Sequence, residues 1–485
     1  MRHEKFIEEY VQALQQENAG LFVGAGLSTS AGYPSWKDLV HDLAEDIGLD
    51  VNLETDLPGV VQYFLNSAGR KRTRLASLIS KEIGIDKRIP EILHTLARFP
   101  LKHIWTTNYD ELLERAWREQ RLFLEVNTTK QNLVINNPAA HAQLYKMHGT
   151  VGNPSDVVIA KGDYEGYRRE RGEFLNLLHS HLVSRRMLFL GFSFTDPNLS
   201  QLFTLIRDSF GDMPPEHYAV VKRPQRGDFA GRGAKARFAY ADRRHKLWVK
   251  DLENYGIQCI EVDAWAELDE LMKAVEQRLA AASVMVSGSC PEVLPEGEPD
   301  YRRKIEAVAQ GVGKFLIHEN YRIVSGFGLV VGSATLSGAL DELYRDVAPN
   351  LERRLFLRPF PQLIPPGQDR QEFYRRYRED LVRQAGACVF ICGAKIDGNS
   401  VVVADGVIAE YDILKALGRT PIPIGATGGA AQKIWEAVNA NFPAVFGTMP
   451  RRSFDILNDA TAVPEQLIKA VGDILKWVRK NGRVI

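Results

Sequence analysis

A short apolar run that ends at two glycines constrains the fold of this chain more than any other feature. Residues 21–23 read Leu-Phe-Val, and Gly24 and Gly26 follow directly. An apolar run of this length, bounded by glycines, predicts a buried strand followed by a tight turn. Backbone N–H groups in such a turn can approach a pyrophosphate closely. The stretch therefore predicts a nucleotide site in an α/β layer.

As a dinucleotide-binding fingerprint, this pattern is incomplete. Thr29 replaces the third glycine of G-x-G-x-x-G, and no acidic residue ends an obvious second strand about 20 residues later. Two glycines after a strand also occur in ordinary turns. The ends of the other predicted strands must therefore decide between a simple turn and a ligand site.

Three further predicted strands in the first half of the chain end in polar residues. The residues at these ends are Asn108 and Asp110, His148 with Gly149, and Gly191 with Ser193. Sheets of the α/β class place their ligands at the carboxyl ends of parallel strands. We therefore expect these residues and the glycine turn to line one crevice. The basic stretch 223–244 is interpreted as an exposed, loop-like insert whose charges are solvated.

The second half of the chain repeats the alternation of strands and helices. The predicted strands are 284–286, 322–325, 355–357, 387–391 and 421–424. Alternation of this kind predicts a second doubly wound parallel sheet, and the glycines at its strand ends suit a nucleotide or phosphate. A Walker lysine-serine pair is absent, which argues against ATP hydrolysis. We place the two α/β domains at 1–282 and 283–485.

Length and charge limit the remaining possibilities. A chain of 485 residues is too long for one core. Lys plus Arg and Asp plus Glu both number 61, so no overall field attracts nucleic acid or an anionic membrane. The charged N-terminus lacks the apolar segment of a signal peptide, and no apolar run is long enough to span a bilayer. We expect a cytoplasmic protein that binds neither membranes nor nucleic acid.

The motifs of the first half, taken as a set, resemble those of the sirtuins. Gly24-Ala25-Gly26-x-Ser28, Thr107-Asn108-Tyr-Asp110, His148-Gly149 and Gly191-x-Ser193 occur in the sirtuin order. The resemblance implies that Asn108 and His148 are catalytic. It also implies that Gly24, Ala25, Gly26 and Ser28 cradle NAD as a substrate, and that Ser193 contacts the adenosine side.

The residues support that reading by their own chemistry. Cleavage of the nicotinamide–ribose bond needs a group near neutral pKa to take a proton from water or a ribose hydroxyl, and histidine is suited to this task. Asn108 can orient that water or hydroxyl, and Asp110 can hold the ribose or carboxamide end. The alternative for the Asn108 to Asp110 segment is a helix N-cap.

Two departures from the sirtuin pattern bear on the reaction. Sirtuin deacylases hold a structural zinc with cysteine pairs placed after the His-Gly motif, and no cysteine lies between His148 and Ser193. Thr107 stands where deacylases have glutamine. We therefore expect no metal, and we favour water over an acetyl-lysine peptide as the acceptor. The chain's four cysteines are interpreted as reduced and structural.

The second half resembles a SLOG domain, a Rossmann-like fold that binds nucleotide-derived signals. The resemblance rests on Ser287-Gly288-Ser289, on Gly326-Phe-Gly328 and on Glu410 in a predicted helix. It implies that Arg378 and Lys395 face the phosphates of the ligand, and that Glu410 contacts a ribose or base. The implied signal-binding residues are Gly288, Ser289, Gly326, Gly328, Arg378, Lys395 and Glu410.

The fusion of the two domains resembles the NAD-degrading effectors of the Thoeris anti-phage defence system. The resemblance implies an NAD⁺ glycohydrolase that is activated by a cyclic ADP-ribose isomer bound to the SLOG domain. A TIR-domain partner would make this signal, and the effector would be a homo-oligomer, a tetramer. Two alternatives remain open from the residues: an NAD-dependent protein deacylase, and a non-enzymatic nucleotide sensor.

Overall fold

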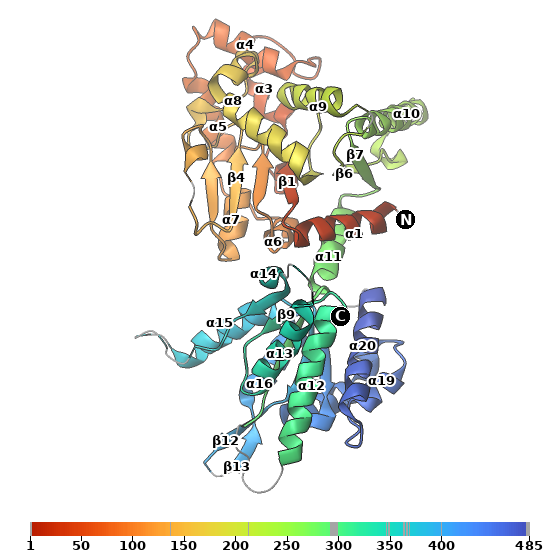
Figure 1. The fold of residues 1–485 in the computed structure, drawn as a ribbon. Helices are drawn as coiled ribbons and strands as arrows, with labels where there is room; N and C mark the ends of the chain where they lie inside the picture. Colours follow the sequence, from red (N-terminus) through yellow and green to blue (C-terminus); the bar gives the residue numbers. More distant parts are fainter. Residues whose placement is uncertain are drawn as a thin grey trace. The chain divides into compact units, whose positions relative to one another are not determined.

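The computed structural model describes residues 2–481, apart from 136, 212, 292–298, 346, 348, 349, 362, 363, 365, 366, 368 and 399. The chain forms two compact units, Met1–Glu276 and Gln277–Ile485, each built around a parallel sheet (Figure 1). The predicted fold class is therefore confirmed. The units divide inside a helix, whereas the predicted boundary of 282 and 283 follows that helix.

The sheet of the first unit has seven parallel strands in the order β3-β4-β2-β1-β5-β6-β7. The strands are β1 (Ala19–Val23), β2 (His103–Thr106), β3 (Leu124–Asn127), β4 (Ala142–Lys146), β5 (Arg186–Leu190), β6 (His217–Lys222) and β7 (Ile257–Val262). Every residue of the central strand β1 is buried. Strands β2 to β4 lie on one side of β1 and β5 to β7 on the other, so the strand order reverses beside β1. Ligands of doubly wound sheets bind at such a reversal.

Helices surround this sheet and form most of its connections. They are α1 (Arg2–Gln15), α2 (Ala25–Ser30), α3 (Trp36–Glu45), α4 (Leu57–Ser67), α5 (Thr73–Ile83), α6 (Glu91–Ala97), α7 (Leu112–Glu119), α8 (Lys161–Ser184), α9 (Pro197–Phe210), α10 (Ala234–Glu253) and α11 (Ala266–Ala280). The loop-like interpretation of 223–244 was wrong from Ala234 onward, because alanines and long basic side chains favour a helix there.

The second unit contains a five-stranded parallel sheet in the order β10-β9-β8-β11-β14. The strands are β8 (Ser283–Ser289), β9 (Arg322–Ser325), β10 (Leu355–Leu357), β11 (Ala387–Cys392) and β14 (Thr420–Ile424). An antiparallel hairpin of β12 (Ala394–Asp397) and β13 (Ser400–Val403) follows β11 and was not predicted.

The helices of the second unit pack around its sheet (Figure 1). They are α12 (Pro299–His318), α13 (Val331–Leu343), α14 (Leu351–Arg354), α15 (Arg370–Val382), α16 (Asp405–Ala416), α17 (Gly429–Ala440), α18 (Phe442–Phe446), α19 (Arg451–Ile456) and α20 (Pro464–Asn481). Strand β11 is buried along its whole length, so this sheet is covered on both faces. Among the helices described in either unit, none has the length and apolar character needed to cross a membrane.

Candidate functional site

The glycines after β1 allow that turn to pack directly against the turn after β5. Gly24 N–H donates to Leu190 O at 2.8 Å, and Gly26 N–H donates to Gly191 O at 2.9 Å. A Cβ on Gly24 would lie 2.4 Å from Gly191 O, which is closer than any real contact. These two N–H groups therefore bind within the protein. Ala25 and Gly26 are exposed, and their contact with a dinucleotide stays a prediction.

Asn108, just beyond the end of β2, is oriented by two hydrogen bonds. Its Nδ2 donates to Gly24 O at 3.0 Å and to Ser28 Oγ at 2.8 Å. The opposite amide orientation would place two carbonyl oxygens against each other. Asn108 Oδ1 is buried and accepts no hydrogen bond from the described residues. An oriented amide with an unused acceptor suits a water molecule or a sugar hydroxyl.

Asp110 links Ser28 to the start of α7. Its Oδ2 accepts from the Ser28 hydroxyl at 2.6 Å, and its Oδ1 accepts from Leu112 N at 3.1 Å. Asp110 therefore accepts from the first turn of α7, as the helix N-cap alternative expects. The side chain of Asn108 instead contacts the loop after β1. Asp110 and Ser28 together fix the amide of Asn108. Their predicted contact with NAD stays a prediction.

Lys146 at the end of β4 is a fully buried cation that the sequence reasoning did not single out. Its Nζ donates to Asp110 O at 2.5 Å and to Glu114 Oε1 at 2.7 Å. A buried charge needs such partners, because desolvation without them is costly. Lys146 therefore joins β4 to the segment that carries Asn108. The sequence signal was a lysine inside an otherwise apolar run.

His148 follows β4 and is almost completely buried, at 4% exposure. Its Nε2 lies 3.1 Å from Asp196 Oδ2, although the two groups are not aligned as a good hydrogen bond. Asp196 follows β5 and begins α9, where its Oδ1 accepts from Asn198 N and Leu199 N. Sequence reasoning missed Asp196 as a site residue, because an aspartate before proline reads as an ordinary helix cap.

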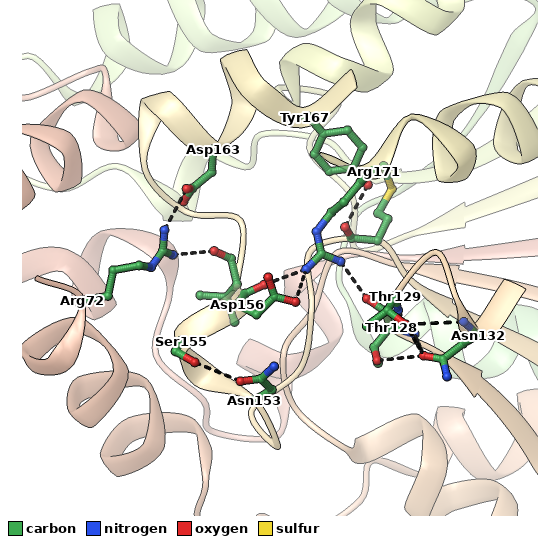
Figure 2. A network of polar contacts seen from close by, with 12 residues as sticks. Arg72, Thr128, Thr129, Asn132, Asn153, Ser155, Asp156, Asp163, Tyr167 and Arg171 are labelled. Atoms are coloured by element: carbon green, nitrogen blue, oxygen red, sulfur yellow. Dashed lines mark hydrogen bonds and ion pairs between the residues drawn. The ribbon is translucent and has the colours of Figure 1, made fainter. Parts of the chain in front are cut away.

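Tyr167 and Arg171 of helix α8 contact the segments that follow β3 and β4 (Figure 2). The Tyr167 hydroxyl donates to Met147 O at 2.8 Å, next to the histidine. Arg171 bridges the Asp156 carboxylate and Thr128 O, each at 2.7 Å. A buried guanidinium that binds both segments fixes the loop after β4 against the neighbouring strand. These contacts thus hold the backbone beside His148 in place.

Ser193 lies in the same turn as Gly191, and its side chain contacts Thr195 rather than the other predicted site residues. Its exposed hydroxyl lies 2.7 Å from Thr195 Oγ1. No contact among the described residues joins it to Asn108 or His148. Its predicted role on the adenosine side stays a prediction.

The second unit brings glycines together at the carboxyl edge of its sheet. A Cβ on Gly288 would lie 1.9 Å from Ile391 O, and one on Gly328 would lie 2.0 Å from Gly288 O. Between Gly328 and α13, Val330 has a φ of +64°, a value that is costly for a β-branched residue. Strained backbone is often found at ligand sites. Gly326 lies in the same turn.

Glu410 on α16 is buried and accepts from Ser287 Oγ at 2.5 Å. Burial raises the pKa of Glu410 to about 7, against the opposing effects of the Ser287 hydrogen bond and the Arg378 charge. The Arg378 guanidinium lies 4.9 Å from the ring centre of Phe360, and its Nε is buried without a hydrogen bond among the described residues. Glu410 and Arg378 therefore stand in one polar cluster.

Two other predicted signal-binding residues lie near the β12–β13 hairpin. Ser289 Oγ donates to Ala394 O at 2.9 Å. Lys395 Nζ pairs with Asp405 at 2.6 Å on the surface. The roles of all seven residues in binding a signal stay predictions.

The fold and these clusters define a SIR2-like domain followed by a SLOG domain. Residues 102–260 match the SIR2-like domain family, and residues 267–478 match the Sir2- and TIR-associating SLOG family. Both resemblances seen in the sequence are confirmed.

Comparison with whole proteins identifies the family more closely. The chain is 36% identical over 472 residues to the NAD(+) hydrolase ThsA of Bacillus cereus strain MSX-D12, covering 96% of this chain and 97% of that protein. It is 32% identical over 481 residues to the NAD(+) hydrolase ThsA of Acinetobacter baumannii strain 532279, covering 97% and 98%. The Bacillus subtilis defense-associated sirtuin 2 is 26% identical over 216 residues, covering 42% of this chain and 21% of that protein. The chain belongs to the ThsA family of NAD(+) hydrolases.

Proposed function

We propose that this chain cleaves NAD⁺ to nicotinamide and ADP-ribose with water as the acceptor, and that a cyclic ADP-ribose isomer bound to its SLOG domain switches the reaction on. Family membership supports the hydrolase activity. The observation that carries the site is the buried, unused Oδ1 of Asn108, held in place by Ser28. It stands at the same sheet edge as His148.

The chemistry follows from these two side chains. Loss of nicotinamide leaves an oxocarbenium-like ribose, which water must attack. Asn108 Oδ1 accepts a hydrogen bond from that water or from a ribose hydroxyl, and His148 takes the proton. A general base of this kind contributes about 10²- to 10⁴-fold to the rate. Burial of both groups strengthens their interactions with the reacting atoms.

The SLOG domain offers a different chemistry. The Arg378 fork suits a phosphate, and a protonated Glu410 can donate a hydrogen bond to a ribose or base. Control of one site by the other requires two arrangements with different affinity for the signal. We propose that the change occurs in a homotetramer in the cytoplasm, and that a TIR-domain partner supplies the signal. The match to a Sir2- and TIR-associating family supports such a partner.

The principal alternative is a protein deacylase, which the SIR2-like match alone would permit. The two functions differ in acceptor, so product analysis separates them. We expect the purified chain, supplied with the cyclic ADP-ribose isomer that activates it, to release nicotinamide and ADP-ribose in equal amounts without any acetylated peptide. His148→Ala and Asn108→Ala should each lower this release by about 10²-fold or more. Release that depends on an acetyl-lysine peptide would identify a deacylase, and no release at all would favour a nucleotide sensor.

A further inference from the structure

Asp196 uses its two carboxylate oxygens for two different partners. Oδ1 accepts from Asn198 N at 2.9 Å and from Leu199 N at 3.1 Å, which caps α9. Oδ2 faces His148 Nε2 at 3.1 Å. The side chains of Asp196 and His148 are only 7% and 4% exposed. The N-cap explains one oxygen, and the second oxygen is directed at the histidine.

The rings packed against His148 carry no charge at working pH. Tyr164 and Tyr167 of α8 lie edge-on to the imidazole, with ring centres at 5.5 and 6.0 Å. Burial raises the pKa of both phenols well above the ordinary value, so both stay protonated. Neither ring can balance a positive charge on His148 by ionising.

Two titratable groups that act on Tyr164, Tyr109 and Asp163, are engaged with other partners. The buried Tyr109 hydroxyl donates to Val158 O at 2.7 Å. Asp163 of α8 is paired with Arg72 at 2.8 Å. Of the described groups named here, Asp196 alone combines a charge with a direct contact to the imidazole.

We propose that Asp196 is a positioning residue for His148, because its carboxylate holds the imidazole in one orientation and stabilises the imidazolium that forms during NAD⁺ cleavage. The inference rests on the proposed role of His148 as the base. A proton on Nε2, the ring nitrogen 3.1 Å from the carboxylate, leaves the lone pair on Nδ1. The proton from water or a ribose hydroxyl therefore moves to Nδ1, and Asp196 remains ionised throughout.

The charge state of Asp196 agrees with this role. Burial tends to raise its pKa, but the His148 contact and the two α9 backbone N–H groups outweigh that effect and hold it below the ordinary value. Asp196 is therefore a carboxylate wherever the enzyme works. A fixed negative charge against a buried imidazole favours the imidazolium.

The decisive variant is Asp196→Asn. Asparagine caps helices as well as aspartate does, so α9 keeps its cap while the charge is lost. We expect kcat to fall about 10- to 100-fold with little change in KM, a loss of the size seen when carboxylates that orient metal-bound histidines are removed. The acid limb of the kcat/KM profile should also move to lower pH, because the imidazolium loses its negatively charged neighbour. Asp196→Glu, which keeps the charge, should restore the acid limb toward that of the wild type.

Glu261→Gln provides a matched control. Glu261 Oε1 lies 2.9 Å from His245 Nε2, a similar carboxylate–histidine contact elsewhere in the first unit. Each variant is assayed as the full chain with the cyclic ADP-ribose isomer that activates the wild type. We expect Glu261→Gln to leave both kcat and the acid limb unchanged.

The outcomes separate this proposal from the proposed function. An inactive His148→Ala together with an unchanged Asp196→Asn profile would overturn the role of Asp196 alone. Asp196→Asn could also lose activity together with a lower thermal midpoint, while the acid limb stays in place. That result would likewise overturn the role of Asp196, because it would show a purely structural effect. If His148→Ala remained active, the proposed role of His148 as the base would be wrong, and the positioning role of Asp196 would be wrong with it.

Discussion

Ser28 donates a hydrogen bond of 2.6 Å to Asp110 Oδ2 and in the same geometry accepts one of 2.8 Å from Asn108. Ser28 therefore holds the side-chain amide of Asn108 in place, whether or not Ser28 itself contacts NAD⁺. Removing the hydroxyl should misplace the amide during catalysis more than it weakens substrate binding.

We accordingly expect Ser28→Ala to lower kcat by about 10-fold or more, with KM changed far less. Steady-state kinetics of nicotinamide release measure both quantities. A raised KM with an unchanged kcat would instead show that Ser28 cradles the dinucleotide, as the sirtuin resemblance implies.

Gly191 is expected to tolerate no side chain. Its φ is +63°, and a Cβ would lie 2.7 Å from Leu27 N. Gly191→Ala should lower the thermal midpoint and impair catalysis, because the turns after β1 and β5 must then separate. Gly233→Ala is the control, since Gly233 has a φ of +81° with nothing within 4 Å of its Cβ position. That variant should cost only about 1–2 kcal/mol for the left-handed backbone, with catalysis intact. Equal behaviour of the two variants would contradict the packing argument.

Glu410 should make the second unit less stable as pH rises. Its folded-state pKa is raised to about 7, whereas an unfolded glutamate titrates near 4.5. The folded state therefore holds a proton that the unfolded state has lost, so stability falls between about pH 4.5 and pH 7 and stays low above. Glu410→Gln removes this dependence. The difference in thermal midpoint, variant minus wild type, should grow across that range and then level off. Parallel curves would show that Glu410 is ionised when folded.

Arg378 should control the response to the signal. Arg378→Ala is expected to raise the concentration of cyclic ADP-ribose isomer needed for half-activation by about 10-fold or more, because a charge-assisted bond to phosphate is lost. Arg376 on the same helix is the control, since its side chain is 53% exposed and paired with Glu372. Arg376→Ala should leave the activating concentration unchanged. Equal curves for both variants, with the fold intact by thermal midpoint, would remove Arg378 from the site.

The elements that position the site were predictable because strong local signals mark them. The apolar run 21–23 lies within β1, and the four apolar residues 187–190 before Gly191 lie within β5. The polar residues after both strands stand at the same sheet edge. Strand β3 was missed because its four residues Leu-Glu-Val-Asn mix apolar and polar groups without a clear boundary. Hairpin β12–β13 was missed because most of its residues are exposed.

The contacts within the site were less predictable than its edge. Asp196 reads as a helix cap from its neighbours alone, and only the tertiary fold brings its second oxygen to His148. Likewise, the sequence marks Gly24 and Gly26 as a turn for phosphate, but it does not reveal that their N–H groups bond to Leu190 and Gly191. Local sequence patterns identify which residues belong to the site. The contacts that each residue makes depend on partners far apart in the chain.

The most direct test of the central claim is the rate of nicotinamide release from NAD⁺ by the full-length wild-type chain, measured as a cyclic ADP-ribose isomer is titrated. Our account predicts a rate near background without the isomer and a saturable rise with it, and this rise should be absent in His148→Ala. The same rate with and without every isomer tested would contradict signal control, and release that persists in His148→Ala would contradict the proposed site.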